Sequence, residues 1–111
     1  AARFELKKTA NGELLFNLKA GNGEIILTSE RYKTKPGALN GIDSVRNNAT
    51  DAHRLEPREA ANGQPYFVLK ATHGDIIGYS ELYSSGQGLE KGIASVQQNA
   101  PAARVDDLTA R

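Results

Sequence analysis

The chain has 111 residues, of which 39% are hydrophobic and 24% are charged, a length that suits one small domain. It contains no cysteine, which excludes a disulfide framework, a thiolate zinc site and a cysteine nucleophile. Its 14 basic and 13 acidic residues leave a formal charge of +1, so there is no charge excess to capture nucleic acid or an anionic membrane. No apolar run approaches the roughly 20 residues of a membrane span and no charged-then-apolar leader opens the sequence, so we expect a cytoplasmic protein.

The sequence repeats itself at an offset of 51 positions. Residues 3–53 align with residues 54–104 without a gap, and 23 of the 51 pairs are identical. A gapless repeat of this quality predicts two copies of one supersecondary unit. Because no Gly/Ser-rich spacer separates the copies, we predict a first unit over residues 1–53 and a second over residues 54–111, folded together as one intertwined domain.

The start of each unit predicts a β-hairpin. Phe4 and Leu6 alternate with charged residues, as in a strand with one buried face, and Asn11-Gly12 follows as a hairpin signal. A two-residue loop would put Phe4 and Leu6 on the face opposite Phe16. A three-residue loop with a glycine bulge puts them on the same face, and we favour this arrangement.

The second strand is followed by a second turn and a third strand. Glycines in residues 21–23 predict the turn, and the third strand lies around residues 24–28. Because a slip of one residue inverts every side chain of a strand, the pattern leaves open whether Ile25 or Ile26 faces the core.

A helix follows the three strands in each unit. Thr34 is the predicted N-cap of the first helix, and Ser84 or Ser85 that of the second. Gly41 and Gly92 stand beside the apolar stripes and indicate a close approach between helix and sheet, because a mid-helix glycine costs about 1 kcal/mol relative to alanine. The stripes have spacings of four, three and four residues and consist of Ala38, Ile42, Val45 and Ala49, and then Leu89, Ile93, Val96 and Ala100.

The segment between the first helix and the second hairpin predicts a single shared strand. Residues 53–59 follow the helix directly and contain Leu55, the counterpart of Phe4. We therefore expect one continuous strand to serve both units, with Val105 and Leu108 supplying the closing strand. The predicted fold class is α+β: a tandem repeat of β-β-β-α-β units that form one antiparallel sheet with two helices on one face.

The chain resembles the YegP-like family of small bacterial proteins of unknown function. The resemblance covers residues 3–107 and rests on two motifs, Lys-Ala-x-Asn-Gly, which begins at Lys19, and Gly-Ile-x-Ser-Val, which begins at Gly41. It implies that the two units combine into a single sheet and exchange terminal strands. It brings no established catalytic residues. The second copy departs from the family pattern at His73 and Gly78, which affects turn geometry and local packing.

Polar residues near the strand-to-helix loops form one candidate site. As a pair of equivalent ligand sites, these loops would make the chain a small-ligand protein or an enzyme. Each residue type also has an ordinary structural role at its position, and we favour that interpretation. The candidate loop site consists of Ser29, Glu30 and Tyr32 with their copies Ser80, Glu81 and Tyr83.

The sheet face that no helix covers forms the other candidate site. It is more apolar than expected for a surface without a binding role, and such patches often mark contact with a partner. Rings and lysines on an open sheet also suit weak binding of single-stranded nucleic acid, but the rings are few and the net charge is close to zero. The candidate interaction face consists of Leu15, Asn17, Lys19, Tyr66, Val68, Lys70 and Tyr79.

The sequence favours a non-catalytic binding or interaction module that uses the open sheet face. His53 and His73 have no ligand-spaced companions, and no nucleophile elbow, phosphate loop or dinucleotide motif occurs. We therefore assign no catalytic residue, no metal site and no cofactor. The expected partner is a protein or small molecule rather than nucleic acid or a membrane, and the expected state is a monomer or weak homodimer.

Overall fold

The computed structural model describes residues 1–110. The order of elements is that of the predicted repeat, three strands and a helix in each unit followed by a closing strand. The first unit contains β1 (Arg3–Lys8), β2 (Leu14–Lys19), β3 (Ile25–Ser29) and α1 (Lys35–Asn48). The second contains β4 (Leu55–Glu59), β5 (Pro65–Lys70), β6 (Ile76–Tyr79), α2 (Gly86–Asn99) and β7 (Arg104–Asp107).

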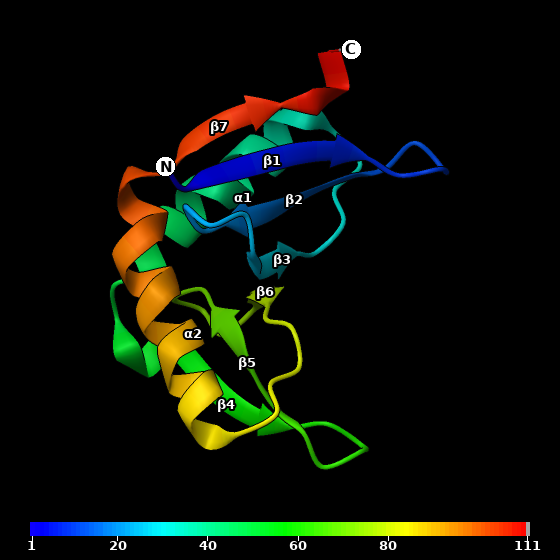
Figure 1. Cartoon of the computed structure of the whole chain (residues 1–111). Helices are drawn as coiled ribbons and strands as arrows, with labels where there is room; N and C mark the ends of the chain where they lie inside the picture. Colours follow the sequence, from blue (N-terminus) through cyan, green and yellow to red (C-terminus); the bar gives the residue numbers. More distant parts are fainter. Residues whose placement is uncertain (111) are drawn as a thin grey trace.

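The seven strands form one sheet in the order β4-β5-β6-β3-β2-β1-β7, with the two units joined edge to edge at β3 and β6 (Figure 1). Each helix reaches across this junction, since α1 contacts β5 and β6 while α2 contacts β3. The core is one cluster that contains Phe4 and Phe16 from the first unit and Phe67 and Leu69 from the second. The α+β fold with two helices on one face is thereby confirmed, whereas the boundary at residues 53 and 54 stays a prediction.

The prediction of a wholly antiparallel sheet is wrong at one edge. β7 pairs with β1 in parallel, with Phe4 opposite Val105 and Leu6 opposite Asp107. Figure 1 shows the reason: the chain leaves α2 beside the N-terminus, so β7 and β1 start from the same end of the sheet. Neighbouring strands that start from the same end of a sheet run parallel to each other. β7 of the second unit thus adds to the strands of the first, whereas no described strand of the first unit adds to the outer edge of the second, so the predicted exchange of terminal strands occurs in one direction.

The hairpin turns determine which residues face the core. In the first turn the Thr9 amide donates to the Glu13 carbonyl at 2.7 Å, and Gly12 has a φ of 87°. This is the three-residue loop with a glycine in the left-handed region, as predicted. It places Leu6 opposite Phe16 on the helix side of the sheet.

A β-bulge decides the orientation of the two isoleucines in the first unit. Leu18 pairs with Leu27, but the register then shifts and Lys19 pairs with Ile25. Ile26 is the extra residue, and it is 5% exposed within the core. Ile25 is half-buried and lies on the opposite face of the sheet together with Lys19.

Both helices begin at hydroxyl caps. The Thr34 hydroxyl accepts from the Gly37 amide at 3.2 Å, and the Ser85 hydroxyl accepts from the Gly88 amide at 3.1 Å. Thr34 is thus the predicted cap, and of the two serines left open for the second helix Ser85 is the cap. Within residues 1–110 no helix is both long and apolar enough to cross a membrane.

The shared-strand prediction for residues 53–59 is wrong. β4 pairs only with β5, in the position that β1 holds in the first unit, and no described strand lies on its outer side. Phe67 of β5 uses both its backbone amide and its backbone carbonyl for hydrogen bonds to Ser80, on the β6 side. Pro57 of β4 lies opposite Phe67, so the polar backbone groups of Pro57 point away from β5, toward the outer edge of the sheet. Because proline has no N–H, the outer edge of β4 lacks a donor where Leu6 of β1 faces β7.

We expect Pro57→Thr to increase self-association of the chain through the β4 edge. The substitution restores one backbone donor, which corresponds to about 1 kcal/mol or roughly a five-fold tighter dimer. Sedimentation equilibrium over a range of concentrations measures the change. Glu59→Thr on the same edge is the matched control. Equal dimerisation by the two variants would show that Pro57 is not what prevents strand pairing at the β4 edge.

Candidate functional site

The surface of the sheet opposite the helices, here called the open face, contains all seven residues of the predicted interaction face. The cross-strand pairs place Tyr79 between Thr28 of β3 and Val68 of β5. The side chains differ in accessibility: Tyr79 is 42% exposed, whereas Asn17 and Val68 are buried. The side chains of Asn17 and Val68 therefore pack beneath their neighbours on this face and are not accessible to a partner. The remaining five residues, Leu15, Lys19, Tyr66, Lys70 and Tyr79, are half-buried or exposed, and their role in binding stays a prediction.

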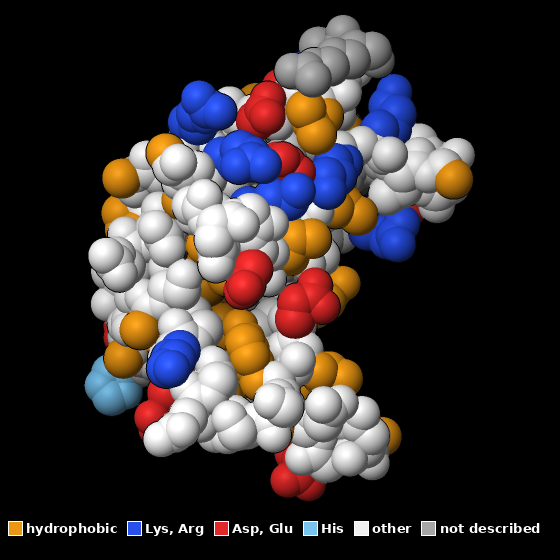
Figure 2. Space-filling view, viewed as in Figure 1, with side chains coloured by type: hydrophobic (Ala, Val, Ile, Leu, Met, Phe, Trp, Pro, Cys, Tyr) orange, Lys and Arg blue, Asp and Glu red, His pale blue; other side chains and the backbone are white. Residues whose placement is uncertain are grey.

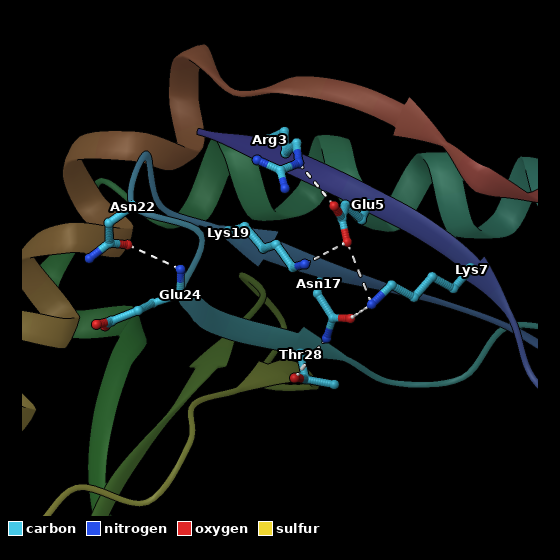
Figure 3. A network of polar contacts seen from close by, with 8 residues as sticks. All are labelled: Arg3, Glu5, Lys7, Asn17, Lys19, Asn22, Glu24 and Thr28. Atoms are coloured by element: carbon cyan, nitrogen blue, oxygen red, sulfur yellow. Dashed lines mark hydrogen bonds and ion pairs between the residues drawn. The ribbon is translucent and has the colours of Figure 1, made fainter. Parts of the chain in front are cut away.

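A carboxylate beneath three cations forms the centre of the first unit's half of the open face (Figure 3). Glu5 of β1 contacts Arg3 at 2.9 Å, Lys19 of β2 at 3.0 Å and Lys7 at 3.5 Å, and only 9% of its side chain is exposed. The Lys7 ammonium also donates to the Asn17 amide oxygen at 3.0 Å. The buried oxygens of Glu5 and Asn17 thus hold these cations in defined positions on the open face. We call Arg3, Glu5, Lys7 and Lys19 the cationic cluster.

The environment of Glu5 keeps its carboxylate charged. The hydrogen bond from Lys19 lowers the pKa of Glu5 from 4.5 to about 2, with a further contribution from Arg3, and these effects exceed the opposing effect of burial. Three positive charges against one negative charge leave the cationic cluster with a net charge of +2 near neutral pH. Figure 2 shows Lys and Arg side chains gathered over this part of the molecule.

The second unit repeats the arrangement in a more exposed form. Glu56, the counterpart of Glu5, contacts Arg58 at 2.8 Å and Lys70 at 2.9 Å, and its side chain is 41% exposed. The hydrogen bond from Lys70, followed by that from Arg58, lowers the pKa of Glu56. The difference in exposure follows from the sheet order, because β7 lies along β1 whereas β4 forms an edge.

Sequence reasoning selected Lys19 and Lys70 but missed their carboxylate partners. A signal was present, since Glu5 interrupts the pair Phe4 and Leu6 and returns unchanged as Glu56. A charged residue between two core residues of a strand points to the opposite face, where lysines of the next strand lie. The alternation of apolar and charged residues along this strand does not indicate that Glu5 is buried.

The serines of the candidate loop site have structural roles. The Ser29 hydroxyl accepts from the Phe16 amide at 2.8 Å and donates to the Glu30 carbonyl at 2.7 Å. Ser80 repeats both bonds with Phe67 and Glu81 at 2.9 and 2.8 Å. Each hydroxyl replaces a backbone partner where the strand ends, and both serines are buried.

The tyrosines of the candidate loop site pack against helix glycines. The Tyr32 ring stacks on Phe16 at 6.1 Å and its hydroxyl reaches Gly41, and Tyr83 stacks on Phe67 at 6.3 Å. The predicted close approach at the mid-helix glycines is thus made by a tyrosine rather than by the sheet backbone.

The three residues of each predicted loop site differ in accessibility, and the use of these loops as ligand sites stays a prediction. Glu30 and Glu81 are exposed, while the serines are buried on the core side of their strands. Of the six, only Tyr83 lines either of the two described cavities. Among the described residues no group of three or more His, Asp or Glu side chains is placed to hold a metal ion.

The repeat corresponds to a known domain family. The family described as "Domain of unknown function (DUF1508)" matches residues 9–56 and again residues 60–107. A UPF0339 protein of Pseudomonas aeruginosa is 50% identical over 107 residues, which cover 96% of this chain and 97% of that protein. The UPF0339 protein YegP of Yersinia pestis is 48% identical over 106 residues, covering 96% of this chain and 95% of YegP.

Two solution structures have the same fold. The yegP protein of E. coli, described as a protein of unknown function, has a TM-score of 0.92 at 48% identity, and the match covers 97% of this chain and 93% of that one. A UPF0339 protein of Shewanella oneidensis has a TM-score of 0.90 at 47% identity, covering 96% and 91% of the two chains. The resemblance drawn from the sequence motifs is thereby confirmed.

Proposed function

This chain belongs to the UPF0339 (YegP) family of tandem DUF1508 proteins, and we propose its function from the chemistry of its surface. We propose that it is a non-catalytic interaction module that binds an extended polypeptide segment on the open face. The segment would alternate acidic and apolar side chains. The observation that carries the proposal is the cationic cluster, held over a buried carboxylate beside accessible apolar side chains of the same face.

The charge of the cluster supports an acidic partner. A net charge of +2 on neighbouring strands attracts carboxylates and directs their approach, and cations held in place lose little side-chain entropy on binding. Glu5 itself is buried, so the groups that a partner meets are the ammonium and guanidinium ends of Lys7, Lys19 and Arg3.

The apolar side chains of the open face support a partner with hydrophobic residues. Tyr79 is 42% exposed at the centre of the sheet, and Leu15, Ile25, Tyr66 and Ile76 are half-buried on the strands around it. Side chains of an extended segment alternate in direction, so acidic and apolar residues of a partner can reach the two kinds of group from one backbone.

The proposal predicts that the chain binds a synthetic peptide of six Asp-Leu pairs and does not bind one of six Lys-Leu pairs. Lys7→Gln combined with Tyr79→Ser removes one cation and the most exposed ring of the open face. We expect this variant to bind the Asp-Leu peptide about tenfold more weakly, equivalent to about 1.4 kcal/mol. NMR titration measures the affinity and is expected to place the shifted amides on β1, β2 and β6.

Lys33→Gln combined with Leu82→Ser is the matched control, because both side chains are exposed in the strand-to-helix loops and away from the open face. This control variant should bind as the unchanged chain does. Equal affinity of the two double variants, or no saturable shift with the Asp-Leu peptide, would contradict the proposal. Binding of a twelve-residue oligo(dT) in place of the peptide would assign the face to single-stranded nucleic acid instead.

A further inference from the structure

A cavity of about 340 Å³ lies between the two units on the helix side of the sheet. One wall is the β2–β3 turn of the first unit, with Asn22 and Glu24, and the other is α2 of the second unit, with Lys91 and Ser95. Figure 3 shows the Asn22 and Glu24 side chains on this turn beside α2. The volume lies in the range of sites for small molecules.

The position of Tyr83 places a hydroxyl at the wall of this cavity. Its ring stacks on Phe67 with an interplanar angle of 9°, and its hydroxyl reaches α2 at Gly92, where a Cβ would lie 2.5 Å from the tyrosine Cζ. Among the described residues the hydroxyl forms no hydrogen bond, and because no buried side-chain polar atom there lacks a partner, this hydroxyl is reached by solvent. Burial, followed by the nearby charges of Glu81 and Glu24, raises the pKa of Tyr83, so near neutral pH the hydroxyl is a donor.

Opposite charges lie on the two walls of the cavity. Neither the Glu24 carboxylate nor the Lys91 ammonium forms an ion pair or a side-chain hydrogen bond within the described part of the chain. The Ser95 hydroxyl accepts from the Asn99 amide at 3.0 Å and keeps its own proton for donation. The cavity therefore offers an anionic acceptor on one side and a cation with neutral donors on the other.

We propose that this cavity binds a free α-amino acid with a small apolar side chain. An α-amino acid carries an ammonium and a carboxylate on one carbon, so it can present the ammonium to Glu24 and the carboxylate to Lys91, Ser95 and the Tyr83 hydroxyl. Ala20 and Ile26 supply the apolar part of the lining for its side chain. The site is separate from the open face, since it lies on the side of the sheet where the helices pack.

The corresponding position in the other half of the molecule lacks this chemistry. The repeat places Asn40 where Lys91 stands and His73 where Asn22 stands. There His73 contacts Asp75, the counterpart of Glu24, at 2.7 Å. With the acid paired and the lysine absent, we expect one amino-acid site in each chain.

NMR titration of the full chain with glycine, alanine, serine, valine and leucine, each up to 10 mM, tests the proposal. Alanine, valine or leucine should give saturable shifts at the amides of residues 20–26 and 88–95, at lower concentrations than serine does. Glu24→Gln and Lys91→Gln should each weaken that binding at least tenfold, while Asp75→Asn, the matched change in the other unit, should leave it unchanged. These surface changes preserve the fold, which the dispersion of the spectra checks directly.

Two further ligands separate a zwitterion site from a simple anion site. Acetate and methylammonium each carry one of the two charges, and each should bind at least tenfold more weakly than the amino acid. Acetate binding with equal affinity, equal binding by Glu24→Gln, or no saturable shift with alanine, valine or leucine would overturn the proposal. Because the peptide titration reports on β1, β2 and β6, failure of one proposal is distinguishable from failure of the other.

Discussion

Replacing Gly41 with alanine is expected to lower the free energy of unfolding by about 2 kcal/mol, although alanine is the better helix former by about 1 kcal/mol. The reason is the Tyr32 ring, whose Cζ would lie 2.6 Å from the new Cβ with the hydroxyl closer still. The ring cannot move away easily, because it stacks on Phe16, which itself would lie 3.1 Å from the Cβ. Urea unfolding monitored by circular dichroism measures the change.

Two comparison variants isolate the contact between Gly41 and Tyr32. Gly86→Ala also replaces a helix glycine, but its Cβ would meet nothing within 4 Å, so this variant should be neutral or slightly stabilised. Adding Tyr32→Leu to Gly41→Ala should cost less than the sum of the two single changes, because the residues are in contact. If Gly41→Ala were as stable as Gly86→Ala, the tyrosine would not be the reason for the glycine.

Replacing Glu5 with glutamine is expected to lower the free energy of unfolding by about 2 kcal/mol at pH 7. The variant leaves Arg3, Lys7 and Lys19 close together without the carboxylate that neutralises part of their charge. Urea unfolding at pH 7 measures the loss. Glu56→Gln is the matched control in the second unit, and because its side chain is 41% exposed and at an edge we expect a much smaller loss.

The same carboxylate makes stability depend on pH in a defined range. The pKa of Glu5 is about 2 in the folded chain and 4.5 at its ordinary value, so the unfolded chain takes up the proton first as the pH falls. The stabilisation from Glu5 is complete above pH 4.5 and is lost between pH 4.5 and 2. The difference between Glu5→Gln and the unchanged chain should therefore shrink over this range. A difference that stayed constant from pH 7 to pH 3 would exclude Glu5 as its source.

The parts of the fold that were predicted correctly depend on neighbours in the sequence. Asn11-Gly12 predicted a hairpin turn because a glycine in the left-handed region suits such turns, and the alternation of Phe4, Leu6 and Phe16 favoured the three-residue loop. The spacing of Ile42 and Val45 predicted a helix face, and Thr34 its start, from groups within one or two turns of the helix. The duplication of all these signals predicted the two units and the single sheet.

The parts that were missed depend on groups far apart in the chain. The parallel direction of β7 is set by where α2 ends relative to β1, and the separate role of β4 by which edge of the sheet accepts it. Ile26 could not be assigned to the core from alternation, because the bulge shifts the register by one residue.

The sequence alone determined the repeat, the kinds of element in each unit and the strand face that points away from the helices, because periodicity and turn chemistry act over a few residues. Only the tertiary structure decided the burial of Glu5, which depends on β7 lying along β1. It also decided that the turn before Glu24 meets α2 of the other unit to form a cavity. Burial and cavity shape arise where segments distant in sequence pack together, and no local pattern encodes that packing.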